Sequence, residues 1–227
     1  MPSATTLQAM RRKTTADFRF TVKTHRSLTH DILQGRGIVD APERFEEFRA
    51  GLRPLLDSGQ LGGVLAQFPM RFTNRPECRD YLDRAIDRLG DLGLIVEFRH
   101  ASWRTDETLA HLRRRGVASC VVDEPPLPDL MPWTGDVTAD TAYVRLHGRP
   151  AAQWFGTSVA ERYDYLCGEP ELVELADKVE DLSRRARRVL IFFNNCHAGA
   201  AARNARQFRE LLIARGLLAK APPAALF

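Results

Sequence analysis

Two stretches decide the fold of this chain: VEFRH at residues 96–100 and YVRLHGR at residues 143–149. Alternate side chains of a β-strand point to opposite faces of a sheet. Each stretch therefore has one apolar face and one face that carries carboxylate, guanidinium or imidazole groups. Burying such groups without partners costs several kcal/mol each. We therefore expect the polar faces of these strands to point into a shared pocket.

The rest of the chain alternates between short apolar segments and segments with helical periodicity. We expect six strands, at residues 18–25, 62–69, 94–100, 118–123, 142–148 and 189–195. Apolar residues recur at helical spacing in the intervening segments, near residues 45–56, 81–89, 109–112, 172–182 and 205–212. Gly51 and Pro54 should kink the first of these helices. Regular alternation of strand and helix predicts a parallel sheet with helices outside it.

The polar strand faces distinguish between two architectures that share this pattern. A doubly wound sheet packs helices on both faces, so its central strands are apolar throughout. Here Lys23 and His25 alternate with Phe20 and Val22. The sequence contains neither a G-x-G-x-x-G nor a Walker phosphate-binding motif. We therefore predict a TIM-type (β/α) barrel with its polar residues at the C-terminal ends of the strands.

Length and composition fit one soluble α/β domain. The chain has 227 residues, of which 44% are hydrophobic and 27% charged, and we expect a single domain over residues 1–227. The net charge of +4 permits an anionic ligand but does not require one. The four cysteines lack metal-site spacing, and we find no signal peptide and no membrane-spanning apolar run. We expect a cytoplasmic protein and assign it no metal and no cofactor. A divalent metal on Glu97, Asp123, His147 or His25 stays an alternative, although no diagnostic ligand spacing is present.

Several motifs carry a resemblance to a known family. They are FxVK at 20–23 with Thr29-His30, LxQFP at 65–69, EFRHxxW at 97–103, Asp123, YVRLHG at 143–148, FFNN at 192–195 and GxAxxNA at 199–205. In these motifs the chain resembles the YecE-like family, known as domain of unknown function 72, over almost its whole length. The resemblance implies a TIM-type barrel related in shape to xylose-isomerase-like barrels. The family has no established activity, so the resemblance implies a fold rather than a function.

One departure from the family pattern affects the expected fold. Family members normally begin with two further strands, whereas Met1 lies in what resembles the helix that follows them. We therefore expect six of the eight barrel strands, with segments 18–25 and 189–195 each lacking a neighbour. An exposed strand edge is a template for pairing with another chain. We expect the open barrel to be completed by a second copy, by a separate N-terminal piece, or by upstream residues if Met1 is not the true start.

The polar residues at the strand ends are the candidate site. Glu97 and His147 are candidate general acid–base groups. The candidate substrate-binding residues are Lys23, His25, Arg99, His100, Asp123, Arg145, Arg149 and Asn195. Lysine, arginine and histidine side chains suit a phosphate or carboxylate ligand, and arginines among possible ligands repel a metal cation. The alternative for Glu97 and Arg99 is a purely structural ion pair.

Two classes of function fit these residues. The first is an enzyme, hydrolase-like, that acts on an anionic, phosphate-containing or sugar-phosphate-like substrate, or on a nucleic acid component. The second is a non-catalytic binding protein, or a truncated barrel that needs a partner to complete its fold. The residues alone leave both open.

Overall fold

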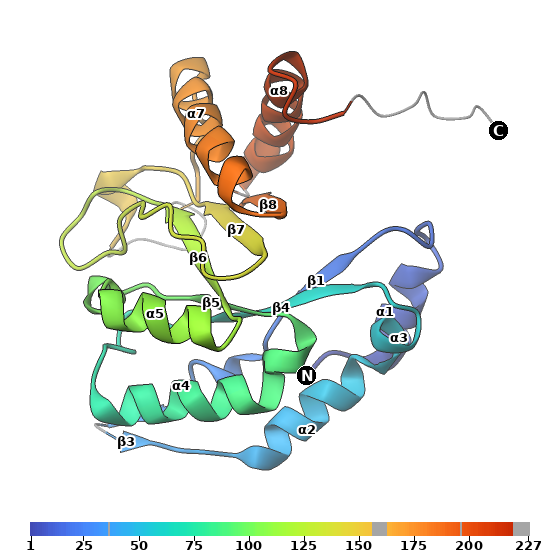
Figure 1. The fold of residues 1–227 in the computed structure, drawn as a ribbon, viewed down its shortest axis with the longest axis vertical. Coiled ribbons are helices and arrows are strands. Elements are labelled where there is room, and N and C mark those ends of the chain that lie inside the picture. Colours follow the sequence, from blue (N-terminus) through green and yellow to red (C-terminus); the bar gives the residue numbers. More distant parts are fainter. Residues whose placement is uncertain (36, 156–162, 196, 220–227) are drawn as a thin grey trace. The chain divides into compact units, whose positions relative to one another are not determined.

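A computed structural model describes residues 1–35, 37–155, 163–195 and 197–219 (Figure 1). The chain divides into two compact units: Met1–Cys120 with Asp129–Met131, and Val121–Pro128 with Pro132–Phe227. Strand β6 (Ala118–Asp123) begins in the first unit and ends in the second. A single domain over residues 1–227 stays a prediction.

The first unit contains a parallel sheet whose strands end in polar residues. Its strands are β1 (Phe20–Lys23), β4 (Leu61–Gln67), β5 (Leu94–Glu97) and the first part of β6. They pair in this order, and each pairing is parallel. Gln67 lies opposite Glu97 in the register, and Lys23 lies opposite Leu65. The polar ends of β1, β4 and β5 therefore lie next to one another.

The helices of the first unit follow the predicted pattern. They are α1 (Ala4–Arg11), α2 (Pro42–Gly51), α3 (Arg53–Asp57), α4 (Pro76–Leu89) and α5 (Asp106–Arg114). Where a kink was predicted, the helix is interrupted at Leu52, because Pro54 lacks a backbone N–H and is tolerated only in the first turn of α3. Thr105 caps α5 by accepting a hydrogen bond from the Thr108 N–H at 3.1 Å. Shorter elements complete the unit: η1 (Arg26–Leu28), β2 (Leu33–Gln34), β3 (Gly37–Ile38), η2 (Gly90–Leu92) and η3 (Ala101–Trp103).

Four aromatic side chains hold the loops that follow β4 and β5. Phe68 stacks on Phe72 with ring centroids 4.0 Å apart, and Phe98 stacks on Trp103 at 4.4 Å. The Trp103 indole donates a hydrogen bond to the carbonyl of Phe72 at 2.6 Å. All four side chains are buried. Trp103 is therefore a packing residue that fixes the backbone just beyond the polar strand ends.

The second unit places two helices beside two parallel strands. Its elements are β7 (Thr141–Leu146), η4 (Ala151–Gln153), α7 (Glu169–Arg185), β8 (Arg188–Phe193), η5 (His197–Gly199) and α8 (Ala200–Ala214). Val144 and Leu146 of β7 pack in one apolar cluster with Leu175 and Phe208. Arg145 lies between them in the strand and points to the opposite face. The alternation of apolar and polar side chains expected for this strand is confirmed.

The six strands follow the order β1-β4-β5-β6-β7-β8, and the predicted α/β fold with a parallel sheet is confirmed. A closed TIM-type barrel stays a prediction. Strands β1 and β8 stand at the two ends of this order, and in the described parts of the chain each pairs with one strand. Several strands are shorter than predicted: β5 ends at Glu97 rather than His100, because His100 caps η3 (Ala101–Trp103).

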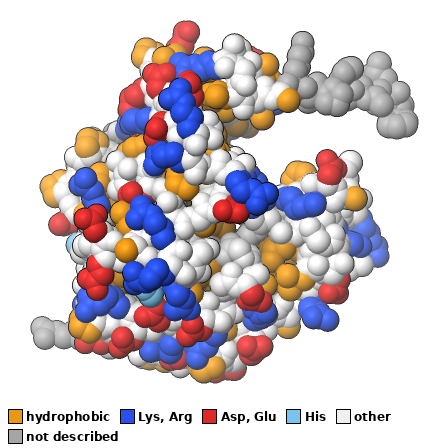
Figure 2. All heavy atoms as spheres, viewed as in Figure 1, with side chains coloured by type: hydrophobic (Ala, Val, Ile, Leu, Met, Phe, Trp, Pro, Cys, Tyr) orange, Lys and Arg blue, Asp and Glu red, His pale blue; other side chains and the backbone are white. Residues whose placement is uncertain are grey.

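Charged side chains of both signs are interspersed over the face drawn in Figure 2. Many arginines are paired with carboxylates, as in Arg184 with Glu180 at 2.6 Å and Arg215 with Asp177 at 2.5 Å. The mild excess of positive charge is thus distributed among ion pairs and is not gathered into one basic patch on this face. Among the described residues, no helix combines the length and the apolar character needed to cross a bilayer.

Candidate functional site

The candidate residues fall into two sets, one in each unit. The first unit holds Lys23, His25, Glu97, Arg99 and His100. The second unit holds Asp123, Arg145, His147, Arg149 and Asn195. That Glu97 and His147 share one pocket stays a prediction. In the part of the chain that the structure describes, no three potential metal ligands cluster together.

The C-terminal ends of β1, β4 and β5 bring several polar groups of the first unit together. Lys23, Gln67 and Glu97 are the last residues of these three strands. The Lys23 ammonium donates a hydrogen bond to the Gln67 side-chain oxygen at 2.9 Å. Gln67 in turn lies beside Glu97 in the sheet register. A cation, an amide and a carboxylate therefore line adjacent strand ends.

Glu97 forms a buried ion pair with Arg99. The Arg99 Nε lies 3.0 Å from Glu97 Oε1. The Glu97 side chain is fully buried, and the Arg99 side chain is 10% exposed. The ion pair that the sequence offered as an alternative for Glu97 and Arg99 is thus present. A buried pair of this kind is stable only while both charges are present, since each alone would carry an uncompensated desolvation cost.

His30 is a functional candidate that sequence reasoning missed. Burial lowers the pKa of its imidazole most strongly, and the positive charges of Lys23, Arg26 and Arg99 lower it further. Asp31 acts in the opposite direction. Three cations therefore surround a ring that stays neutral at pH 7. The Thr29-His30 pair was visible in the sequence as a family motif, but only the fold shows that this loop returns to the end of β1.

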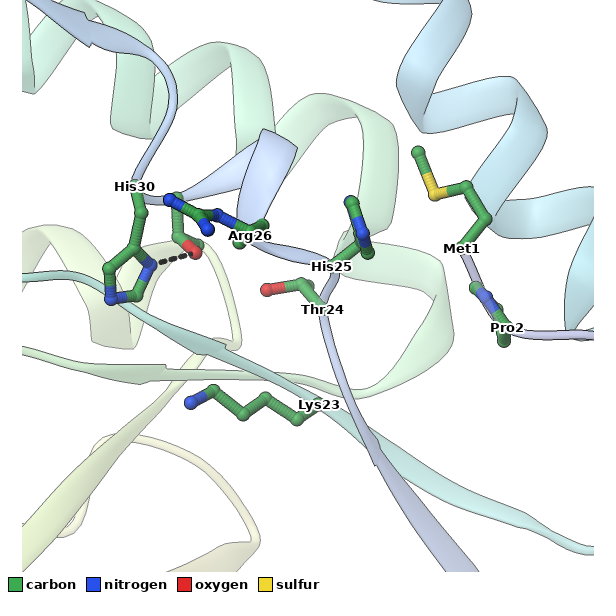
Figure 3. Close-up of a pocket in the computed structure, with 8 residues that line it drawn as sticks. Met1, Pro2, Lys23, Thr24, His25, Arg26 and His30 are labelled. Atoms are coloured by element: carbon green, nitrogen blue, oxygen red, sulfur yellow. Dashed lines mark hydrogen bonds between the residues drawn. The ribbon is translucent and has the colours of Figure 1, made fainter. Parts of the chain in front are cut away.

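A pocket of about 460 Å³ opens beside this cluster (Figure 3). Its walls come from Lys23 and the loop that follows it, and from the start of the chain. The lining residues are Met1, Pro2, Lys23, Thr24, His25, Arg26, Thr29 and His30. Figure 3 shows Lys23, Thr24 and Arg26 extending toward the side where His30 lies, with Met1 and Pro2 on the other side. The pocket thus has a basic end and an end with the apolar side chains of Met1 and Pro2.

Two predicted binding residues cap short helical turns. His25 Nδ1 accepts a hydrogen bond from the Ser27 N–H at 3.3 Å and caps η1. His100 Nδ1 accepts a hydrogen bond from the Ser102 N–H at 3.0 Å and caps η3. The repeated His-x-Ser pattern therefore shapes the loops after β1 and β5. His25 also lines the pocket, whereas the observed contacts of His100 are structural.

In the second unit Asn194 links Arg145 and His147. The Arg145 guanidinium donates to Asn194 Oδ1 at 2.7 Å, and Asn194 Nδ2 lies 3.1 Å from His147 Nδ1. A guanidinium can only donate, so the amide oxygen must face Arg145 and the NH₂ group must face the ring. His147 Nδ1 is then an acceptor. The neutral ring therefore carries its proton on Nε2.

Asp123 and Arg149 belong to a second ion-pair network. The Arg149 Nη2 lies 2.7 Å from Asp123 Oδ1, and its Nη1 lies 3.0 Å from Glu174 on α7. Asp123 raises the pKa of Arg149 most strongly, with Glu174 adding to the effect. An anion at this guanidinium would compete with two carboxylates. An anion beside Arg145, His147 and Arg149 therefore has a weaker basis than one at the pocket of the first unit.

The same network predicts acid sensitivity. Arg149, with a smaller effect from Lys178, lowers the pKa of Glu174 from 4.5 to about 2. Because the folded-state pKa is the lower one, this carboxylate stabilises the fold above about pH 4.5 and loses that effect as the pH falls toward 2. Glu174 is 45% exposed, so we expect a contribution of only about 1 kcal/mol or less.

Urea unfolding between pH 2 and pH 6 tests this expectation. Glu174→Gln should be less stable than the parent protein at pH 6, and the difference should shrink toward pH 2. A difference between the two proteins that stays constant over this range would contradict the assignment of the acid effect to Glu174.

Asn195 lies in a buried network that anchors the loop before α7. Its NH₂ group donates to the Tyr165 carbonyl at 2.7 Å and to Asn204 Oδ1 at 2.9 Å. Asn204 in turn accepts from the Cys167 N–H and donates to the Cys167 carbonyl, both at 3.0 Å. Burial raises the pKa of the Cys167 thiol to about 12, so this cysteine is not a nucleophile at neutral pH. The observed contacts of Asn195 are those of a structural anchor.

Comparison with known proteins decides the family. The family model described as "Protein of unknown function DUF72" matches residues 1–226. The chain belongs to the DUF72 family. This confirms the resemblance found in the sequence motifs. The UPF0759 protein YunF of Bacillus subtilis (strain 168) is a relative with 30% identity over 215 residues, covering 88% of this chain and 75% of YunF.

Solved structures of DUF72 proteins share the fold. A DUF72 family protein (TM1631) from Thermotoga maritima MSB8 is 43% identical, with a TM-score of 0.87, over 94% of this chain and 80% of that one. A DUF72 family protein (EF0366) from Enterococcus faecalis V583 is 26% identical, with a TM-score of 0.86, over 100% of this chain and 85% of that one. These names state a family and no activity, so the function has to be argued from the site.

Proposed function

We propose that this DUF72 protein is an enzyme of hydrolase type that acts on an anionic, phosphate-containing substrate at the C-terminal ends of β1, β4 and β5. The observation that carries the proposal is the set of three cations, Lys23, Arg26 and Arg99, that act on one neutral histidine beside a pocket. Such a positive, partly desolvated site suits a phosphate group. The buried Glu97 beside Arg99 supplies a carboxylate for proton transfer.

The proposed reaction is hydrolysis of a phosphate ester. The oxygen of a water molecule bonds to phosphorus, and the ester P–O bond breaks. Glu97 accepts the proton that the water loses, and that proton then neutralises the leaving alkoxide. Lys23 and Arg99 offset the negative charge of the phosphoryl group in the transition state.

Turnover of phosphate esters by the purified full chain tests the proposal. We expect release of inorganic phosphate from at least one member of a panel of sugar phosphates, other monoesters and diesters. Glu97→Gln, which keeps the shape of the side chain, should lower the rate by a factor of about 10²–10⁴. The matched control, Glu47→Gln, changes an exposed carboxylate on α2 and should leave the rate unchanged. Absence of turnover across the whole panel would count against the proposal.

A second candidate function is favoured by the strand edges. Strand β8 stands at one end of the strand order, and its Phe192 is 36% exposed. An apolar, open strand edge favours pairing with another chain. The candidate function is a binding protein that associates with a second copy of itself through β8.

A further inference from the structure

The pocket beside β1 has features besides its positive charge that indicate which ligand it binds. We infer that it is the subsite for a phosphate monoester, in which Lys23, Thr24 and Arg26 bind the phosphate group and His30 donates or accepts a hydrogen bond beside it. This inference rests on the proposed function and narrows its substrate class to monoesters of a small organic alcohol. Four features of the pocket support it.

The first feature is the hydroxyl group of Thr24. This side chain is 4% exposed, and among the described residues its Oγ1 has no hydrogen-bond partner. Buried polar groups are nearly always paired, because an unpaired one loses its hydrogen bonds to water without replacement. Thr24 lines the pocket next to Lys23. A phosphate oxygen in the pocket would supply the acceptor that this hydroxyl lacks.

The second feature is the balance of charge at the basic end. The charges acting on His30 come from Lys23 on β1, Arg26 on η1, Arg99 after β5 and Asp31 after η1. Asp31 is the single acidic group among them, and Arg26 Nε donates to it at 3.0 Å. Glu97 lies 3.0 Å from Arg99, so three cations face two carboxylates and a net charge of +1 remains. This net positive charge favours an anionic group such as the phosphate of a monoester.

The third feature is the fixed position of the His30 ring. Thr29 Oγ1 lies 2.9 Å from His30 Nδ1, and Thr29 is buried. This contact leaves Nε2 as the ring atom for a ligand. A neutral imidazole among cations can donate from Nε2 to a phosphate oxygen or accept a proton from it, according to its tautomer.

The fourth feature is the size and polarity of the pocket. A volume of about 460 Å³ lies within the range of small-molecule sites and exceeds the needs of a bare phosphate. Met1 and Pro2 form the end away from His30 (Figure 3). That end suits the organic part of an ester, while the basic end suits its phosphate.

The test is a titration of the full chain with inorganic phosphate, followed by NMR of the histidine ring resonances and compared with sulfate. The His30 resonances are identified with His30→Gln. We expect phosphate to shift them and to raise the pH at which His30 titrates, because the dianion offsets the charges of Lys23, Arg26 and Arg99. His30 resonances that do not respond to phosphate would overturn the inference.

Three variants show whether the predicted residues make the contacts. Arg26→Ala should raise the dissociation constant for phosphate about tenfold. Its matched control, Arg44→Ala, also removes one exposed arginine from one exposed ion pair and should bind phosphate like the parent. Thr24→Val keeps the side-chain shape, and should weaken phosphate binding without lowering the melting temperature of the unliganded protein.

The outcomes separate this inference from the proposed function. Parent-like phosphate binding in both Arg26→Ala and Thr24→Val would overturn the inference, and so would a Thr24→Val protein that melts lower and binds normally. If ester turnover is lost in Glu97→Gln but unaffected in Arg26→Ala and Thr24→Val, the proposed function stands and the inference fails. If these two variants weaken phosphate binding but no ester is hydrolysed, the inference stands and the enzyme proposal fails.

Discussion

Replacing Glu97 with alanine is expected to lower the free energy of unfolding by about 3–5 kcal/mol. The carboxylate is fully buried and lies 3.0 Å from the Arg99 guanidinium, which is itself nearly buried. Removing it leaves a cation in a desolvated position without its counter-charge, and that cost exceeds the loss of the contact itself. Urea denaturation of the two proteins at pH 7 measures the difference.

The control for this experiment is Glu47→Ala. Glu47 also pairs with an arginine at 3.0 Å, but both side chains are 51% exposed. Water replaces a lost partner at such a site, so we expect a change of about 0–1 kcal/mol. Equal stability loss in the two variants would show that burial does not set the cost at Glu97. A Glu97→Ala protein as stable as the parent would show that Arg99 finds other compensation.

In solution the 227-residue chain is expected to self-associate as its concentration rises. Strand β8 pairs with β7 along one side, and no other strand pairs with it in the described ranges. Phe192 stacks on Tyr143 with ring centroids 4.8 Å apart, yet it remains 36% exposed. Open backbone groups and an exposed aromatic ring together form a surface on which a second strand can pair.

Light scattering over a range of concentrations tests the association. Phe192→Lys places a charge on the edge strand and should shift the protein toward monomer. The matched control is Val173→Lys, since Val173 is 37% exposed but lies on helix α7. A parent protein that is monomeric at every concentration would refute the expectation. Association that persists in Phe192→Lys but disappears in Val173→Lys would place the contact on α7.

The sequence predicted the elements of the fold well, because local patterns determine them. Apolar runs marked all six strands, and Pro54 predicted a kink at the place where α2 and α3 are in fact separate helices. The predicted strands were often too long at their C-terminal ends. In the sequence, residues such as His100 continue the polar–apolar alternation of the strand. In the structure, the His100 side chain accepts a hydrogen bond from the backbone of the next turn, and the strand has already ended. Alternation alone cannot distinguish a strand residue from a turn cap.

The candidate site was less predictable, because it depends on contacts between distant segments. The strand face of Glu97 and Arg99 was visible in the sequence, and so was their pairing. Nothing local indicated that Arg149 meets Glu174, which lies 25 residues further along the chain. The importance of His30 depends on Arg99, which belongs to another strand end. Side-chain type shows what a residue can do, and only the fold shows which partners it has.

The amide of Asn194 has a consequence for the chemistry of the second unit. Its oxygen accepts a hydrogen bond from Arg145, so its NH₂ group faces His147 and donates to Nδ1 of that ring. The proton of the imidazole is thereby assigned to one nitrogen by a residue that need not touch any ligand. An aspartate at position 194 would present oxygen atoms to both Arg145 and His147. The His147 ring would then carry its proton on Nδ1 and offer a lone pair at Nε2. Replacing the amide nitrogen of residue 194 by oxygen would thus change Nε2 of His147 from a proton donor to a proton acceptor, although His147 itself is not substituted.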